Sequence, residues 1–268
     1  MDKKLIEEIK KKREFSGLPD SIVERAAEMA KGAPNGHDSG EPDVKKSRAL
    51  LRKYFGVFLT NKVLKGKGSA EEMLKSHMSS KKRDYEEFYG EIFKGMGNVG
   101  SVIDLGAGAN GFSYDYLKKE LGAVNYLAVE ASGQLVDNMN DYFQENKFSA
   151  KAVVGDLFDL ERIKGLLESQ KKPRVVFMFQ VVDALENLEK DFFKKFFLRV
   201  SKECEKIVLS LPTESLGGRK KFAVQRKWII DFLSSKDDPG GPCENFMIEK
   251  DFKTNGERVL VIGKKPNN

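Results

Sequence analysis

Cysteine, histidine and tryptophan are scarce in this sequence of 268 residues, which has two, two and one of them. Cys204 and Cys243 stand apart without the close spacing of metal ligands, and we expect both to be free thiols. His37 and His77 fit no nucleophile pattern and no metal-binding pattern. The sequence therefore predicts no metal site and no acid–base pair of the kind that hydrolases use.

Long apolar runs are also missing, and no stretch is long enough to span a membrane. The chain begins Met1-Asp-Lys-Lys and continues into a charged helix, which does not resemble a signal peptide. Apolar residues make up 40% of the sequence and charged residues 33%. This composition is typical of a soluble protein, and we expect a cytoplasmic monomer without a membrane partner.

Positive charge is concentrated near the N-terminus. Residues 1–90 contain 20 Lys and Arg against 15 Asp and Glu, whereas residues 91–268 contain 27 against 26. The basic stretch 44–67 has eight cations and no acid: Lys45, Lys46, Arg48, Arg52, Lys53, Lys62, Lys65 and Lys67. Such a stretch favours a nucleic-acid partner, because Lys and Arg displace counterions from phosphates. The alternative is a solvated helix face whose aromatic residues Tyr54, Phe55 and Phe58 belong to the core.

The segment Ser101-Val-Ile-Asp-Leu-Gly-Ala-Gly-Ala-Asn-Gly111 is typical of a buried strand, a glycine turn and a helix start. Gly106, Gly108 and Gly111 fit G-x-G-x-x-G, which lets a nucleotide-like ligand approach the backbone. Asp104 would repel a pyrophosphate but attract a cationic amino group, as in S-adenosylmethionine. It therefore disfavours a nicotinamide cofactor. A tight turn with a capping aspartate is the alternative.

Two more acids end predicted strands. Glu130 closes the strand 126–130, and Asp156 closes the strand 152–156. The carboxyl ends of parallel strands meet at one edge of an α/β sheet, so we expect these acids to line one crevice with Asp104. There Glu130 could accept the ribose hydroxyls of an adenosine. Asp156, with Leu157 and Phe158 beside it, could accept the adenine amino group and cover the ring.

Helices and strands follow a two-part pattern along the chain. We expect helices from about Lys3 to Phe15, from Asp20 or Ser21, over Val44–Leu59, from Ala70 with Ser69 as cap, and over Asp84–Phe93. Later strands are expected at Val175–Phe179, Lys206–Leu211 and Arg258–Gly263, with a weaker one at Phe246–Lys250, and Asn255-Gly256 is expected to make a hairpin turn. The alternation after residue 99 predicts a doubly wound α/β fold.

Four segments share a further pattern. Leu211–Arg219 reads Leu-Pro-Thr-Glu-Ser-Leu-Gly-Gly-Arg, and Leu74–Arg83 contains Leu-x-x-His-x-Ser-Ser-x-x-Arg. With Leu18–Val23 and the glycine turn, they resemble the aminoglycoside-resistance rRNA methyltransferases. Those enzymes use S-adenosylmethionine to methylate guanosine at N7 in the decoding site of 16S rRNA.

This resemblance implies a Rossmann-like class I S-adenosylmethionine-dependent methyltransferase fold with a seven-stranded, mostly parallel sheet. Residues 1–93 would form a helical domain that binds the small ribosomal subunit through its 16S rRNA. Residues 94–268 would form the methyltransferase domain. Methylation of guanine N7 needs no general base, because N7 carries a lone pair and no proton, so the enzyme would act by positioning.

The resemblance also implies roles for single residues. Arg83 would hold the methionine carboxylate of the cofactor, and Gln180 stands where the family has lysine. The expected cofactor site consists of His77, Ser79, Arg83, Asp104, Gly106, Gly108, Glu130, Ala131, Asp156, Leu157 and Gln180. The loop facing the target base would contribute Ser215, Leu216 and Arg219. Expected rRNA contacts are Lys10, Lys11, Lys12, Arg13, the eight cations of the basic stretch, Lys220 and Lys221.

Three differences from the family pattern keep other functions open. Glu214 replaces a basic residue, Asp183 replaces a proline, and residues 222–227 differ from the family's segment after the target loop. A methyltransferase acting on another rRNA nucleotide is one alternative. A non-catalytic RNA- or ribosome-binding protein on the same fold is another. A small-molecule methyltransferase ranks last, because it gives the basic N-terminal third no role.

Overall fold

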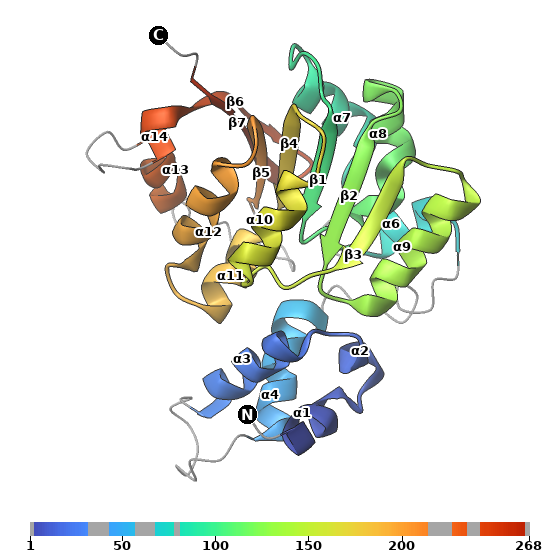
Figure 1. Cartoon of the computed structure of the whole chain (residues 1–268), viewed down its shortest axis with the longest axis vertical. Helices are drawn as coiled ribbons and strands as arrows, with labels where there is room; N and C mark the ends of the chain where they lie inside the picture. The colour runs from blue at the N-terminus through green and yellow to red at the C-terminus, as the bar shows by residue number, and fades with distance from the viewer. Residues whose placement is uncertain are drawn as a thin grey trace.

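The computed structural model describes residues 3–31, 43–56, 68–77, 81–213, 227–234 and 242–265. Figure 1 shows a small helical part, drawn in blue, lying against one edge of a larger α/β part. The helical part consists of α1 (Lys3–Lys10), α2 (Arg13–Ser16), α3 (Asp20–Lys31), α4 (Val44–Leu51) and the single π-helical turn η1 (Arg52–Gly56). It has its own apolar cluster, which includes Ile9, Phe15, Val23 and Leu51.

The α/β part is built on one sheet of seven strands in the order β3-β2-β1-β4-β5-β7-β6. The strands are β1 (Ser101–Leu105), β2 (Asn125–Glu130), β3 (Ala150–Val154), β4 (Arg174–Phe179), β5 (Lys206–Pro212), β6 (Phe246–Thr254) and β7 (Glu257–Lys264). The first five run parallel, and β7 pairs antiparallel with both β5 and β6. The predicted seven-stranded, mostly parallel sheet is confirmed.

Helices cover both faces of this sheet (Figure 1). One face packs against α6 (Ala70–Ser76), α7 (Tyr85–Phe93), α8 (Tyr114–Leu121) and α9 (Gly133–Glu145), and the short 3-10 turn η2 (Asn110–Ser113) precedes α8. The other face packs against α10 (Leu160–Glu168), α11 (Val182–Leu188), α12 (Phe192–Ser201) and α13 (Lys227–Ser234), and α14 (Pro242–Asn245) leads into β6. Neighbouring strand residues such as Val102 and Ile103 belong to opposite layers, as the two-residue period of a strand requires.

The predicted division of the chain at residue 93 stays a prediction. In the structure, α6 and α7 pack against the sheet through residues such as Met73, Phe88 and Ile92. The separate apolar cluster of the helical part draws on residues up to Leu51 and Phe55. Residues 70–93 therefore share the core of the α/β part.

The first expected helix is wrong in its extent, because the chain breaks between Lys10 and Arg13 into α1 and α2. Each helical residue turns the side-chain direction by about 100°, so in one continuous helix Phe15 would lie about half a turn away from Ile6. Lys12 instead adopts an extended backbone (φ −76°, ψ 129°). The break lets Ile6, Ile9 and Phe15 reach the same cluster. The helix expected over 44–59 ends as α4 at Leu51 and continues as η1.

Several predicted helix starts and the predicted hairpin are confirmed. Ser69 and Glu72 form a reciprocal capping box at the start of α6. Asp84 caps α7 by accepting two backbone N–H groups. Asn255 and Gly256 have φ angles of 49° and 81° in the turn between β6 and β7, where a tight hairpin needs left-handed residues.

Candidate functional site

The turn after β1 contains the first two glycines of the motif. Gly106 and Gly108 have φ angles of 74° and 55°, which residues with a side chain rarely adopt. A Cβ at Gly106 would lie 2.6 Å from Cγ1 of Val181, and one at Gly108 would lie 2.8 Å from the imidazole of His77. The turn therefore needs glycine for its backbone and for its close neighbours.

The third glycine serves packing. A Cβ at Gly111 would lie 2.4 Å from the sulfur of Met139 in α9 and 3.1 Å from the ring of Phe143. Gly111 therefore lets η2 approach α9 closely.

A cavity lies beside the glycine turn at the carboxyl edge of the sheet. Its volume is about 830 Å³ when the space out to the solvent at its mouth is counted, which is usual for a small-molecule site. Eight of the eleven expected cofactor residues line it: His77, Gly106, Gly108, Glu130, Ala131, Asp156, Leu157 and Gln180. The rest of the lining is Ile22, Tyr54, Phe55, Val129, Leu135, Gly155, Phe158, Phe179, Val181, Ala184, Leu185 and Leu188.

Glu130 links two turns at one side of the cavity. Its Oε2 accepts a hydrogen bond from the backbone N–H of Gly108 at 2.9 Å, and its Oε1 accepts one from that of Ser132 at 2.9 Å. Burial raises the pKa of Glu130, and these N–H groups oppose the rise. Each carboxylate oxygen keeps a second lone pair, so the group can still accept two hydroxyls from a ligand.

Asp156 lies just after β3 and lines the same cavity. Its Oδ1 accepts from the backbone N–H of Phe158 at 2.9 Å, and its Oδ2 accepts from the hydroxyl of Ser21 at 2.6 Å. Ser21 belongs to α3, so the carboxylate hydrogen-bonds directly to the helical part. Asp156 can accept a ligand amino group through the remaining lone pairs.

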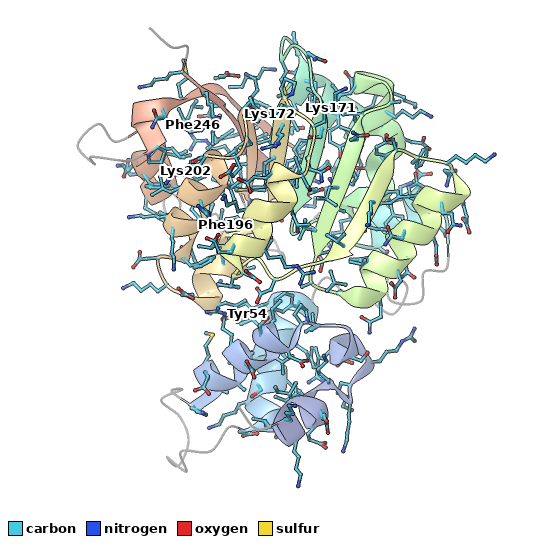
Figure 2. All side chains as sticks on the ribbon, viewed as in Figure 1. Tyr54, Lys171, Lys172, Phe196, Lys202 and Phe246 are labelled. Carbon is cyan, nitrogen blue, oxygen red and sulfur yellow. The ribbon has the colours of Figure 1, made fainter. Side chains whose placement is uncertain are left out.

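The helical part covers the cavity with side chains that are not among the residues expected at the site. Ile22 comes from α3, and Tyr54 and Phe55 come from η1. Figure 2 labels Tyr54 at the boundary between the helical part and the α/β part. The sequence feature that could have indicated these residues is the Tyr54-Phe55 pair inside the basic stretch. The sequence alone does not distinguish that pair from ordinary core residues.

Three further contacts hold the helical part beside the cavity. The guanidinium of Arg25 in α3 lies 4.0 Å from the ring centroid of Phe158, and it pairs with Glu189 at 2.5 Å. The backbone N–H of Gly133 also donates to the carbonyl of Gly17 at 3.0 Å. No sequence pattern indicates these contacts, because they join segments more than 100 positions apart.

Asp104 lies behind the cavity wall and does not line the cavity. Its side chain is fully buried, and Oδ2 accepts from Nδ2 of Asn110 and from the hydroxyl of Tyr126, both at 2.7 Å. Burial raises the pKa of Asp104 to about 6. Instead of the expected contact with a ligand, the structure shows Asp104 supporting the segment after the glycine turn through Asn110.

Arg83 lies behind the wall as well, in a buried ion pair with Glu257. Its Nε and Nη2 donate to Oε1 of Glu257 at 3.1 and 2.8 Å, and Nη2 also donates to Oε2 at 2.9 Å. Its Nη1 donates to Oδ1 of Asn110 at 3.1 Å. The guanidinium carbon is 5.0 Å from the ring centroid of Phe179, which lines the cavity. Arg83 is therefore not in the cavity wall, where the sequence predicts it, and its partner Glu257 carries no sequence signal.

Gln180 stands in the cavity wall with a left-handed backbone, φ 57°, directly after β4. Its backbone N–H donates to the carbonyl of Ser210 in β5 at 3.0 Å. Such a conformation is costly for a residue with a side chain and is found disproportionately at binding sites. The sequence predicts Gln180 at the site but does not indicate this strain.

The two arginines of the basic stretch in α4 and η1 make contacts within the protein. Arg48 donates to the main-chain carbonyl groups of Glu8 and Ile9, so it joins α4 to α1. Arg52 pairs with Glu14 at 3.0 Å. These contacts give Arg48 a structural role, which competes with the predicted contact with RNA.

The lysines of the helical part are mostly more accessible. Lys10 pairs with Asp20 at 2.6 Å, and Lys11 pairs with Glu8. The exposed cations of this part include Lys11, Lys12, Arg13, Lys45 and Lys53, whereas Lys10 and Lys46 are half-buried. The structure therefore presents positive charge on the outside of the part that covers the cavity.

Several predicted residues lie outside the described residues: Ser79, Lys62, Lys65, Lys67, Ser215, Leu216, Arg219, Lys220 and Lys221. Their roles stay predictions. Within the described ranges, no group of three or more His, Cys, Asp or Glu could hold a metal ion. No helix in those ranges is long and apolar enough to cross a membrane.

No protein-family model matches the chain, and no curated protein matches it by sequence. Solved structures do. The 16S rRNA methyltransferase RmtF in complex with S-adenosyl-L-homocysteine has a TM-score of 0.74 at 18% identity, over 99% of this chain and 100% of that one. An rRNA methylase from Escherichia coli has a TM-score of 0.72 at 17% identity, over 98% and 99%. The 16S rRNA methylase RmtB has a TM-score of 0.70 at 18% identity, over 98% of both chains.

These matches extend over the helical part and the α/β part together. The identities are low, so the likeness is one of fold. It confirms the fold that the sequence resemblance implied: the chain has the Rossmann-like fold of the S-adenosylmethionine-dependent methyltransferases.

Proposed function

We propose that this protein is an S-adenosylmethionine-dependent methyltransferase of small-subunit rRNA. Its target is a guanosine in the decoding region, methylated at N7, and the modification protects the ribosome from aminoglycosides. One observation carries the proposal: Glu130 and Asp156 line a single cavity at the carboxyl edge of the sheet, beneath helices that present cations outward. The whole-chain likeness to RmtF and RmtB supports the choice of substrate.

The cavity fits the adenosine end of the cofactor. Glu130 would accept the ribose hydroxyls, and Asp156 would accept the adenine amino group. The glycine turn leaves room where a Cβ at position 108 would collide with His77. The related RmtF was solved with S-adenosyl-L-homocysteine. When bound, S-adenosylmethionine supplies a methyl group on a sulfonium, which is an activated donor.

The residues of this chain would act by binding and orientation. Guanine N7 carries no proton, so no group has to remove one, and alignment of the nucleophile is the main requirement. His77 is suited to this environment, because burial lowers its pKa to about 4 and keeps the imidazole neutral near pH 7. The apolar cover of Ile22, Tyr54 and Phe55 would exclude water from the cofactor.

The helical part would hold the rRNA through phosphates. Exposed cations such as Lys12, Lys45 and Lys53 lie on its surface, and phosphate contacts position a protein on folded RNA without reading bases. The target base would then turn out of its stack toward the cavity. Ser215, Leu216 and Arg219 would meet that base.

Transfer of a tritiated methyl group to purified small subunits tests the proposal, followed by mapping of the modified base. We expect one N7-methylguanosine in the decoding region, and the Asp156→Ala variant serves as the control for cofactor-dependent transfer. Modification of another rRNA nucleotide would overturn the N7 assignment. Calorimetry with S-adenosylmethionine covers the non-catalytic alternative: subunit binding without cofactor binding would overturn the proposal as a whole.

A further inference from the structure

The buried ion pair between Arg83 and Glu257 joins segments that are 174 positions apart. Arg83 lies between the C-terminus of α6 and the start of α7, and Glu257 is the first residue of β7. Glu257 is 3% exposed, and its Oε2 also accepts from the hydroxyl of Ser210 at 2.5 Å. Both oxygens of Glu257 are therefore in use, and the pair has one defined geometry.

The charges of the cavity wall explain why this pair matters. The described lining contains the carboxylates of Glu130 and Asp156 but neither a lysine nor an arginine. A ligand that ends in a carboxylate needs a cation, because a buried anion without one is strongly disfavoured. Arg83 stacks on Phe179, which belongs to the wall, so its charge lies directly behind that wall.

The guanidinium retains capacity for a further contact. It has five N–H donors, of which one on Nε and those on Nη2 are directed to Glu257. Its Nη1 carries two N–H groups, and one donates to Asn110 at 3.1 Å. The hydrogen bonds named here leave the second Nη1–H unassigned.

Burial alone would lower the pKa of Arg83, and the carboxylate of Glu257 reverses this effect and raises it. An unpaired guanidinium in this position would be costly to bury. It would also be free to turn away from the cavity. The partner therefore offsets the cost of burying the guanidinium and fixes its orientation.

We propose that Glu257 is a positioning residue, which holds the guanidinium of Arg83 behind Phe179 so that it serves the carboxylate end of the cofactor. The inference rests on the proposed function and goes beyond it, because it assigns a role to the hairpin β6–β7. No group is transferred in this role. Glu257 acts only on the binding of the amino-acid end of the ligand, through Arg83.

The experiment compares two ligands that differ in that end. S-adenosyl-L-homocysteine carries the carboxylate, and 5′-methylthioadenosine keeps the adenosine and lacks the amino-acid end. In Glu257→Gln we expect calorimetry to show S-adenosyl-L-homocysteine binding weakened by about 10- to 100-fold, which corresponds to one charge-assisted hydrogen bond. The affinity for 5′-methylthioadenosine should stay within about twofold of wild type.

A matched control comes from the same hairpin. Glu249 in β6 pairs with Lys206 at 2.5 Å in a partly exposed ion pair. Glu249→Gln makes the same chemical change away from Arg83 and should leave both affinities unchanged. If Glu257→Gln does not fold, Glu257→Asp decides, because it keeps the charge of the buried pair but shortens the reach of the carboxylate to Arg83 by one methylene. That variant should show the same selective loss of S-adenosyl-L-homocysteine binding, to a smaller extent.

Three results would overturn the inference while the proposed function stands: unchanged binding of S-adenosyl-L-homocysteine in Glu257→Gln, tighter binding, or an equal loss for both ligands. Tighter binding would mean that Glu257 competes with the cofactor carboxylate. An equal loss would mean that the pair only maintains the fold. A wild-type protein that binds neither ligand would overturn the proposed function, and this inference with it.

Discussion

The two regions that enclose the cavity contribute different chemistry. The α/β part supplies the polar groups, such as Glu130 and Asp156, the backbone of the glycine turn and most of the apolar lining, including Leu157 and Phe158. The helical part supplies the apolar side chains of Ile22, Tyr54 and Phe55, and it keeps most of its charges on the outside. The proposed function therefore assigns polar recognition of the cofactor to the α/β part and attraction of rRNA to the helical part.

The two regions also differ in electrostatics. At the cavity, burial shifts the pKa of Asp104, behind the wall, upward and that of His77, in the lining, downward. In the described helical part, the pKa values of Glu8 and Glu14 are lowered, and both of these acids lie near cations. Burial thus governs Asp104 and His77. The hydrogen bond from Lys11 chiefly lowers the pKa of Glu8, and for Glu14 the opposing effect of burial is outweighed by a backbone hydrogen bond and by Arg52. This difference can be tested by changing single residues on either side.

The largest expected effect is a change in the pH dependence of stability in Asp104→Asn. The pKa of Asp104 is about 6 in the folded protein against an ordinary 3.8. Between these values the folded state binds more protons, so wild-type stability falls as pH rises from about 4 to about 6. Roughly two pKa units correspond to about 3 kcal/mol. Relative to wild type, the variant should gain about that free energy of unfolding over this range in urea titrations.

His77→Gln should show the opposite sign. Its ordinary pKa is 6.5, and burial lowers it to about 4. Between these values the unfolded state binds more protons, so wild-type stability falls as pH falls, by roughly 3 kcal/mol in all. The free energy of unfolding of the variant should therefore rise relative to that of wild type as pH drops from 6.5 to 4. A pH-independent difference for either variant would contradict the electrostatic contrast between the regions.

Asp156→Ala should weaken binding of S-adenosylmethionine by roughly 1.5–3 kcal/mol, because a charged acceptor for the adenine amino group is removed. Ser21→Ala is the matched control from the helical side. It removes the hydroxyl that donates to Asp156 at 2.6 Å but keeps the carboxylate. Its affinity should stay within about threefold of wild type. If the control loses as much affinity as Asp156→Ala, the helical part contributes polar recognition and the comparison fails.

The polar half of the cavity could be predicted from the sequence, and the physical reason is the geometry of parallel strands. Glu130 and Asp156 each follow a short apolar run, and the carboxyl ends of such strands must meet at one edge. The glycine turn was equally recognisable, because its positive φ angles require glycine. These features depend on local sequence and on one rule of topology.

The cover that the helical part lays over the cavity and the Arg83–Glu257 pair could not be predicted. Whether Tyr54 and Phe55 face the cavity depends on how the helical part docks, which no local pattern encodes. Glu257 follows an Asn-Gly hairpin turn and so looks like an exposed residue. It is buried because β7 lies between β5 and β6 in the sheet. The same order puts its carboxylate beside Arg83, far away in the sequence.

Gly108→Ala tests whether the close fit of the glycine turn serves the ligand. Gly95 is the control, because it has a similar φ of 71° with open space around its Cβ, whereas a Cβ at Gly108 would lie 2.8 Å from His77. Both Gly108→Ala and Gly95→Ala should lose about 1 kcal/mol of stability from the left-handed backbone, and Gly108→Ala should lose more because its Cβ collides with His77. Only Gly108→Ala should also lose binding of S-adenosyl-L-homocysteine, by about tenfold or roughly 1.4 kcal/mol. Equal affinities in calorimetry would show that the turn is only structural.

The smallest expected effects come from a comparison within the helical part, between the exposed lysines and Arg48. Lys45 and Lys53 are exposed, so replacing both by Gln should leave the free energy of unfolding nearly unchanged. In a plot of the logarithm of the rRNA binding constant against the logarithm of the salt concentration, the slope should become less steep by about 0.7–0.9 for each phosphate that is no longer neutralised. Arg48→Gln should do the reverse. Its guanidinium donates to the carbonyl groups of Glu8 and Ile9, so the variant should lose about 1 kcal/mol of stability and keep the wild-type salt dependence.

The measurement is binding to small subunits at stepped salt concentrations, with urea unfolding in parallel. The contrast depends on position alone, because all three residues carry one positive charge and lie close together in the sequence. If Arg48→Gln flattens the salt dependence as much as one lysine does, its guanidinium reaches phosphate despite its bonds to α1. The outward charge of the helical part would then extend to the side chain that holds its helices together, and RNA binding and stability could not be altered separately there.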